Sequence, residues 1–428
     1  MSLKLLKLKG KLTRILLIVI AIFCVGFGFY FVRWNFANAI ATRLDLKRPE
    51  SRPVVDWLVN AGPSDPQTHY AAASLYEKTF DPGDLERSLK EYETATGLSP
   101  HNYLLWISLG RIRNLNGDVE GANAALRRSL ELAPNYAAVQ WAYGNLLLRE
   151  GKTGEGFGLI ARAAETNPEY ARTAATIALE LLEADVSKVR EALGDTQTTN
   201  SSLTAIFSSQ KRLEEAVESW SRLPAAEKLD KFKPLGESLV GQLAEEKKFR
   251  LAAAVVADMR PEADDKPAIG QISMGGFEKG ISLRGAGLFE WQIGEGPEPQ
   301  IGLSDSQKRS GRYGLFILFN SFEASQFRNI SQTVAVVPGA EYEFDGFYRS
   351  DLKAAGLLKI EIADAAAGAI IGDAPLVLAG DWTTLKIRFA VPANSDGIII
   401  RLAREGCAGP ACRIAGRLAF DDFSITRQ

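Results

Sequence analysis

Residues 103–134 read YLLWISLGRIRNLNGDVEGANAALRRSLELAP, and this stretch governs how the first half of the chain is interpreted. Its last residue, Pro134, lies 34 residues after Pro100 and 34 residues before Pro168. The same interval separates the glycines Gly83, Gly117 and Gly151. A fixed period of this length is typical of helical hairpins, in which each glycine forms the turn within a hairpin and each proline ends its second helix. The spacing therefore predicts three stacked hairpins, enough to share a continuous core.

The unit that ends at Pro134 resembles the tetratricopeptide repeat. It has that repeat's large residue, Leu-Gly pair, Gly-Asp turn, alanine, large apolar residue and closing proline at Trp106, Leu109, Gly110, Gly117, Asp118, Ala122, Leu126 and Pro134. The resemblance implies an all-α solenoid within residues 35–258, with the best repeats over 69–168. We expect two helices to approach closely at Gly110 and at Gly144, and the polar stretch 195–202 to form a loop.

The resemblance also implies a binding groove. In tetratricopeptide domains that bind peptides, the first helix of each hairpin lines a concave surface. The corresponding positions here include Arg111, Asn114, Trp141, Asn145 and Arg149. Their arginines would bind a carboxylate of a protein partner, and Trp141 would be an apolar anchor. The alternative is a solvated groove without a dedicated ligand.

Residues 15–32, ILLIVIAIFCVGFGFYFV, contain no charged residue. As a helix they would extend about 27 Å, close to the thickness of a bilayer's hydrocarbon core. The tail 1–14 is basic and lacks acidic residues, which predicts a cytoplasmic N-terminus, an inner-membrane anchor and a periplasmic bulk. The alternative is a signal peptide cleaved after Ala39, since Ala37-Asn38-Ala39 matches a cleavage site. Both interpretations export the rest of the chain.

Cysteine usage agrees with export. Cys407 and Cys412 flank a Gly-Pro turn, and in an oxidising compartment we expect them to form a disulfide. The alternative is two free thiols in a cytosolic protein.

Composition excludes several functions. The chain has 50 Lys and Arg against 52 Asp and Glu, so it lacks the basic field that holds nucleic acid. With two histidines and three cysteines it cannot readily build a His/Cys metal cluster or a histidine-based hydrolase site. No P-loop, G-x-S-x-G or H-E-x-x-H motif is present. We expect a binding protein rather than an enzyme; a hydrolase that uses two carboxylates is the remaining alternative.

After a linker at residues 259–270 the hydrophobic period changes to two. The expected strands are 315–319, 331–337, 341–348, 357–363, 384–391, 397–402 and 417–425. Many short strands without helices over residues 271–428 predict an antiparallel β-sandwich. The complete prediction is a multidomain chain with one transmembrane helix, an all-α tetratricopeptide solenoid and an all-β jelly-roll sandwich.

The C-terminal part resembles carbohydrate-binding modules of the galactose-binding-like jelly-roll class. The resemblance rests on Gly275–Glu278, Val336–Tyr342, Asp381-Trp382 and Phe420–Ile425. It implies a structural calcium at Glu278 and at Asp421 or Asp422, the alternative being a solvated acidic pair; no other cofactor is expected. Sugar rings stack on aromatic faces while polar groups bind their hydroxyls. The glycan-binding candidates are Phe347, Trp382, Trp291, Asp345, Arg349 and Arg401.

These features together predict a membrane-anchored extracytoplasmic scaffold that binds a protein partner and, through the sandwich, a polysaccharide of the cell envelope. The alternative is a purely structural scaffold in which the sandwich binds no glycan.

Overall fold

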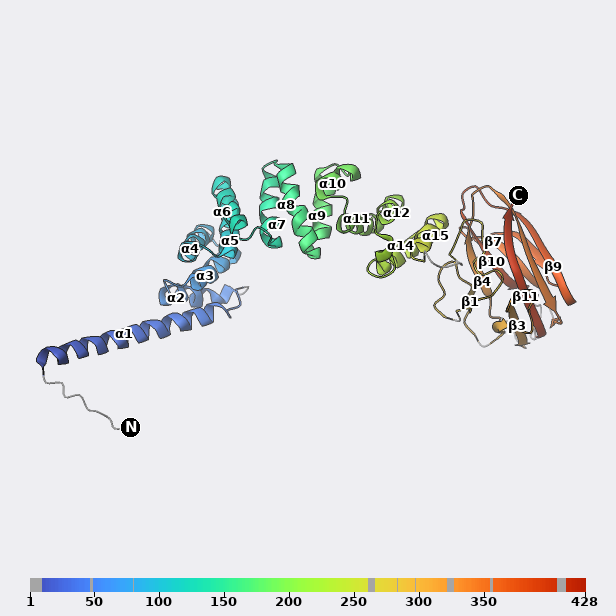
Figure 1. Ribbon diagram of the computed structural model, residues 1–428, viewed down its shortest axis with the longest axis horizontal. Helices are drawn as coiled ribbons and strands as arrows, with labels where there is room; N and C mark the ends of the chain where they lie inside the picture. Colours follow the sequence, from blue (N-terminus) through green and yellow to red (C-terminus); the bar gives the residue numbers. More distant parts are fainter. Residues whose placement is uncertain are drawn as a thin grey trace, which may run out of the picture. The chain divides into compact units, whose positions relative to one another are not determined.

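The computed structural model describes residues 10–46, 49–79, 81–260, 266–282, 284–296, 298–321, 327–354, 357–405 and 413–428. By its internal contacts the chain divides into two compact units, residues 1–198 and residues 199–428. The first unit is helical; the second contains helices followed by two β-sheets (Figure 1).

The first unit begins with the long helix α1 (Lys11–Ala41) and a short 3₁₀ turn, η1 (Pro49–Ser51). The helices that come next are α2 (Arg52–Ala61), α3 (Pro66–Thr79), α4 (Asp84–Leu98), α5 (Tyr103–Leu115), α6 (Val119–Leu132), α7 (Ala137–Arg149), α8 (Thr153–Thr166), α9 (Pro168–Leu181) and α10 (Val186–Leu193). Helix α3 packs on α4, α5 on α6, and α7 on α8, so the three hairpins expected from the 34-residue spacing are present.

The glycines and two of the three prolines have the expected roles in these hairpins. Gly83, Gly117 and Gly151 lie between the two helices of their hairpins, with φ of 80°, 81° and 78°. This is the left-handed region, which glycine adopts without a steric cost. Pro100 and Pro134 lie just after α4 and α6, whereas Pro168 is the first residue of α9, where proline is well tolerated.

The expected close approach of helices occurs at Gly110 and Gly144. A Cβ atom on Gly110 would lie 2.5 Å from Leu126 Cγ, and one on Gly144 would lie 2.8 Å from Ile160 Cγ1 and 2.9 Å from the Gly156 carbonyl oxygen. Only glycine therefore allows the two helices of each hairpin to pack at this distance.

One expectation about the helices is wrong. Residues 195–202 were expected to form a loop, but α11 (Gln197–Ser209) begins within them. Thr199, Asn200 and Ser202 are buried, although their residue types are common in loops. Tertiary packing has outweighed the local propensity of this polar stretch.

Helix α1 is a single uninterrupted helix through Ala37-Asn38-Ala39. It is long and apolar enough to cross a membrane, and the apolar window is exposed throughout, but a signal sequence also has these properties. Its last turns pack against the array: Ala37 and Ala41 are buried in a cluster with Leu58, Ala61 and Ala71.

The second unit begins within α11, at Thr199. The helices that follow are α12 (Leu213–Ser221), α13 (Ala225–Lys228), α14 (Lys233–Glu245) and α15 (Phe249–Asp258). Asp396, from a turn of the sandwich, caps α15 at its N-terminus. Its Oδ1 accepts a hydrogen bond from the Phe249 amide at 2.9 Å, and its Oδ2 accepts one from the Arg250 amide at 3.1 Å. A side chain far along the sequence thus satisfies two N–H groups that a helix cannot satisfy itself.

The strands form two antiparallel sheets. They are β1 (Gln292–Ile293), β2 (Gln300–Ser304), β3 (Gly314–Ser321), β4 (Ile330–Ala335), β5 (Glu341–Ser350), β6 (Lys353–Ala354), β7 (Leu358–Asp364), β8 (Ile370–Pro375), β9 (Ala379–Ala390), β10 (Gly397–Arg404) and β11 (Ile414–Arg427). One sheet has the order β1-β4-β10-β7-β8, and the other β2-β3-β11-β5-β9 with β6 paired to β11. The seven expected strands are confirmed; β1, β2, β6 and β8 had not been predicted.

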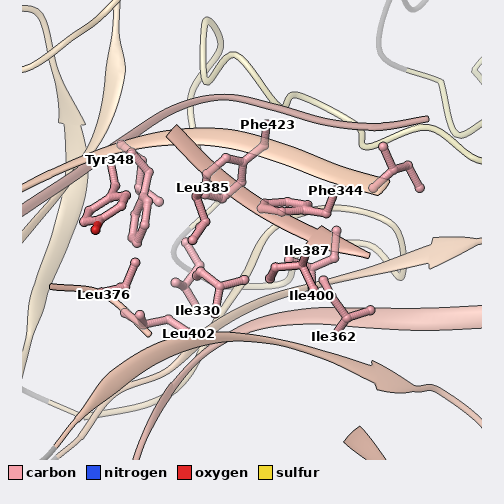
Figure 2. Packing of buried hydrophobic residues seen from close by; sticks show 14 of the residues in the cluster. Ile330, Phe344, Tyr348, Ile362, Leu376, Leu385, Ile387, Ile400, Leu402 and Phe423 are labelled. Carbon is pink, nitrogen blue, oxygen red and sulfur yellow. The ribbon is translucent and has the colours of Figure 1, made fainter. Parts of the chain in front are cut away.

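The inner faces of the two sheets form a shared hydrophobic core (Figure 2). On β5, Tyr342, Phe344 and Tyr348 point inward and are buried, as the two-residue alternation predicted. They meet side chains of the other sheet such as Ile362 and Ile400. The second half of the chain is therefore a β-sandwich, and the outward-facing positions of β5 are available for other contacts.

Replacing glycine at the helix crossing should destabilise the helical unit. Gly144→Ala forces a Cβ into the Ile160 side chain and the Gly156 carbonyl, and we expect a cost of about 1–3 kcal/mol. Gly158→Ala is the matched control, because Gly158 lies in α8 with no neighbouring atom within 4 Å. The control should gain up to about 1 kcal/mol from better helix propensity. Urea unfolding followed by circular dichroism measures both; equal effects of the two variants would contradict the close approach.

Candidate functional site

A groove on the first unit contains all five residues that the sequence proposed for partner binding. Arg111, Asn114, Trp141, Asn145 and Arg149 line one cavity of about 430 Å³. The first two lie on α5 and the other three on α7, the first helices of successive hairpins. Because residues one helical turn apart share a face, each helix directs its candidates into the same space.

The two arginines of this groove differ in their surroundings. Arg111 Nη2 lies 2.7 Å from Glu77 Oε2 on α3. Burial disfavours the charged guanidinium, but the hydrogen bond and the charge of Glu77 outweigh it, so the pKa of Arg111 is raised. Arg149 is exposed, and within the described part of the chain its guanidinium has no hydrogen-bond or ion-pair partner. Arg149 is thus the arginine whose charge is available to a ligand.

The aromatic side chain in the wall of this cavity, Trp141, is paired with a second aromatic ring outside the wall. Trp141 stacks on Tyr170 of α9, with ring centroids 4.7 Å apart and planes inclined by 13°. Asn145 Nδ2 donates to the Trp141 carbonyl at 2.8 Å, so one of its amide hydrogens is used by the helix itself. The sequence did not identify Tyr170, because the 34-residue lattice ends at Pro168 and no register assigns a face to the helix that begins there. The groove combines an aromatic platform with an unpaired cation.

The glycan-binding candidates of the sandwich do not form one site. Trp291 is 3% exposed and packs against Phe277 and Phe423 in the core. Arg401 lies on β10 in the five-stranded sheet, with Nε 2.8 Å from Glu361 Oε2. Both assignments are corrected: a buried indole offers no face to a sugar, and Arg401 belongs to the opposite sheet from Phe347.

Phe347 does point outward from β5, as expected, but its ring is covered. The guanidinium carbon of Arg309 lies 3.5 Å from the ring centroid, a cation–π contact. Arg309 is held there by Asp422, whose Oδ2 accepts from Nη1 at 2.6 Å. Asp345, two residues before Phe347, is bound to Lys386 at 2.6 Å. Arg309 therefore covers the face of the Phe347 ring, and Lys386 binds the Asp345 carboxylate. Both groups had been assigned to a sugar from the sequence.

Arg349 lines a small polar pocket of about 180 Å³ on the outer face of the six-stranded sheet. Gln307, Phe316 and Arg349 lie in its wall together with Asp351 and Arg417. Asp351 is already bound to Arg417 at 2.7 Å, whereas no described residue hydrogen-bonds to the side chains of Arg349 or Gln307. Of the residues that line this pocket, only Arg349 was proposed from the sequence. Phe316 lies on β3 and Gln307 in a loop, and nothing in the sequence spacing shows that either lies next to β5.

Trp382, the remaining aromatic candidate, is half-buried on β9. It lies where the pairing of β5 with β9 shifts register, between Tyr348 and Ser350. The alternation of faces is irregular at such a point, which is why the sequence did not settle its direction.

The three carboxylates assigned to calcium all bind the loop at residues 309–312. Asp421 is fully buried, and its Oδ2 accepts from the Arg309 and Ser310 amides at 2.7 and 3.1 Å. Glu278 accepts from the Arg312 amide, and Asp422 from the Ser310 hydroxyl at 2.7 Å. Burial raises the pKa of Asp421, and the amide hydrogen bonds oppose this rise.

This arrangement does not fit a calcium ion. Calcium takes six to eight oxygen ligands at about 2.3–2.6 Å, and here the carboxylate oxygens are used by amide and hydroxyl donors. Within the part of the chain that the structure describes, no three His, Cys, Asp or Glu side chains gather in a metal-binding group. The acidic residues are better explained as anchors of the 309–312 loop.

Two further features lie apart from these groups. Cys407 and Cys412, the expected disulfide, lie outside the described residues.

Within the second unit, a mainly apolar cavity of about 350 Å³ lies between α14, α15 and residues 267–290, with Val240, Met259 and Phe289 in its wall. Arg260 and Glu290 form an ion pair at this cavity. Sequence patterns did not indicate this cavity, because its walls come from elements of different periodicity.

Comparisons with known proteins identify no family for this chain. No protein-family model matches it, and no curated protein matches it. Solved structures do show likenesses. The structure described as "CBM4 structure and function" is 16% identical, with a TM-score of 0.29, over 37% of this chain and 99% of its own.

Two other solved structures have similar values. TmCBM61 in complex with beta-1,4-galactotriose is 18% identical, with a TM-score of 0.27, over 36% of this chain and 96% of its own. MamA 41-end from Desulfovibrio magneticus RS-1 is 15% identical, with a TM-score of 0.30, over 38% of this chain and 94% of its own. Likenesses of this degree carry no information about the ligand of this protein.

The loop anchored by Asp421 gives a test of the metal assignment. Asp421→Asn places an NH₂ group against a backbone amide that the carboxylate now binds, and we expect a cost of roughly 1–3 kcal/mol. Asp381→Asn is the control, because Asp381 is exposed and no described residue binds its side chain. Differential scanning calorimetry with and without EDTA should give a lower melting temperature for Asp421→Asn alone and no effect of EDTA. A fall in the melting temperature with EDTA would restore the calcium interpretation.

Proposed function

We propose that this chain is a membrane-anchored scaffold whose helical array binds a protein partner outside the cytoplasm. In this proposal α3 to α8 are tetratricopeptide hairpins, residues 15–32 cross the inner membrane with the N-terminus in the cytoplasm, and both compact units are periplasmic. The protein acts by binding rather than by catalysis. Assembly of the cell envelope or of a surface polysaccharide is the process that such an anchored scaffold would serve.

The groove between α5 and α7 supports the proposal. Its wall contains Trp141 and the guanidinium of Arg149, two helical turns apart on α7, and no described residue binds the side chains of Arg149 or Asn114. A cavity with a cation at one point and an aromatic ring at another suits a partner segment that carries a carboxylate and an apolar side chain. Arg111 contributes less charge, because Glu77 already balances it.

The charge of Arg149 gives the test of this groove. Partners would be identified by in-cell crosslinking in the membrane fraction and then measured with purified protein. We expect Arg149→Glu to weaken the partner's affinity about tenfold or more, the effect of losing a charge-assisted hydrogen bond of roughly 1.5–3 kcal/mol. Arg162→Glu is the matched control, because Arg162 is exposed on α8, outside the groove. Equal affinities of wild type and Arg149→Glu would refute partner binding by this groove.

A second function, glycan binding, is supported by the pocket at Arg349. Its wall combines an aromatic ring, Phe316, with the unpaired polar groups of Gln307 and Arg349. Polysaccharide sites use this combination of an apolar surface and a few polar groups. The pocket wall carries two guanidinium groups, Arg349 and Arg417, and one carboxylate, Asp351, so its net positive charge favours an acidic sugar over a neutral one. The alternative remains a scaffold whose sandwich binds no glycan.

Affinity electrophoresis distinguishes these alternatives. The protein should be retarded in a gel that contains an acidic polysaccharide such as alginate, and less in a neutral glucan gel. Arg349→Ala should abolish the difference, whereas Arg427→Ala should not, because Arg427 is exposed on β11 and does not line the pocket. If wild type is retarded by no polysaccharide, the structural scaffold is the correct interpretation.

A further inference from the structure

Helix α1 continues directly from its apolar part into the helical array. It runs unbroken from Lys11 to Ala41 (Figure 1). From Tyr30 onward its side chains contact α2 and the α2–α3 turn, beginning with the hydrogen bond between the Tyr30 and Ser64 hydroxyls at 2.6 Å. Arg33 Nη2 donates to the Asn60 carbonyl at 2.8 Å, and Asn38 Nδ2 donates to Asp65 Oδ1 at 3.0 Å. The apolar segment is therefore attached to the array by a packed helix rather than by a flexible linker.

The packed end of α1 includes the predicted cleavage site. Ala37 is fully buried and Asn38 binds Asp65, so both belong to the fold of the first unit. Cleavage after Ala39 would remove these contacts together with the Tyr30–Ser64 hydrogen bond. The contacts favour an α1 that is retained in the mature protein.

An exposed apolar patch lies beside this junction. Phe36 on α1 is 59% exposed and Trp57 on α2 is 45% exposed, and their rings pack edge to face with centroids 6.3 Å apart. Val54, one turn before Trp57, is 38% exposed. The opposite side of α2 is ordinary core, with Val55, Leu58 and Ala61 buried. Helix α2 thus has apolar residues on both its buried and its exposed side.

The position of this patch along α1 matches a membrane surface. If residues 15–32 fill the hydrocarbon layer, Phe36 follows the last of them by four residues, which is about 6 Å along a helix. The polar interfacial layer extends about 5–7 Å beyond the hydrocarbon on each side. Aromatic residues concentrate at this depth, and Arg33, which is exposed on the same part of α1, suits anionic headgroups. A lipid surface therefore explains the exposed aromatic residues better than water does.

We propose that Phe36, Trp57 and Val54 form a lipid-facing patch that lies in the headgroup layer of the bilayer crossed by α1. The inference rests on the proposed membrane span, and it goes further because it makes α2 a second membrane contact. Contacts on two helices restrict how the first unit can tilt at the surface. The array is then presented at a fixed orientation, as a partner-binding scaffold requires.

Photo-crosslinking of the full-length chain in phosphatidylcholine–phosphatidylglycerol nanodiscs tests this patch. Three single variants carry the photoreactive residue: Phe23→p-benzoylphenylalanine in the middle of the span, Trp57→p-benzoylphenylalanine in the patch, and Leu181→p-benzoylphenylalanine on α9. Each position is exposed, at 70%, 45% and 51%, so the substitutions do not disturb a core. Lipid adducts are then counted by mass spectrometry of the labelled peptides.

We expect lipid adducts at Phe23 and Trp57 and none at Leu181. An adduct at Phe23 without one at Trp57 would overturn the patch and leave the membrane span intact. No adduct at Phe23 would overturn the span and the patch together. Equal adducts at Trp57 and Leu181 would also overturn the patch, because lipid contact would then not be specific to α2.

Discussion

The contact between helix backbones at Gly110 and Gly144 is the constraint on which the groove depends. A side chain at either position would separate the helices of its hairpin, since even a Cβ would overlap Leu126 or Ile160. With the hairpins closed, α5 and α7 hold Arg111 and Arg149 in one cavity wall with Trp141. The arrangement of these cavity residues thus depends on two positions where a side chain would overlap the neighbouring helix.

The sequence placed the five candidate residues on matching helix faces because both helices repeat in register, and these residues line one cavity. A period of 34 residues places Arg111 and Asn145 at the same point of successive hairpins, so assigning a face to one helix assigns it to the next. The prediction stopped where the period stopped. Tyr170 comes after Pro168, so the repeat could not assign it to a helix face. Residues 197–202 also come after Pro168, and their polar composition indicated a loop where the structure has a helix.

The sandwich illustrates a different limit. Alternation correctly separated inward from outward residues on β5, including Phe347. It could not show which sheet a strand joins, so Arg401 was grouped with residues of the opposite sheet. Nor could it show that Arg309, from a loop, covers the Phe347 ring, or that Asp421 holds the same loop by its backbone amides. Contacts between segments far apart in the sequence decide which aromatic and acidic groups remain available.

The packed junction at α1 would favour partner binding by the proposed groove. A flexible linker would let the array sample many orientations, and a partner would then lose part of its binding energy in ordering it. Here the helix that leaves the apolar segment is also part of the first core, with Ala37 and Ala41 packed against Leu58 and Ala71. The small size of these alanines lets α1 approach the array closely, much as the glycines do within the hairpins. The same principle, small residues at helix crossings, thus fixes both the groove and its attachment to α1.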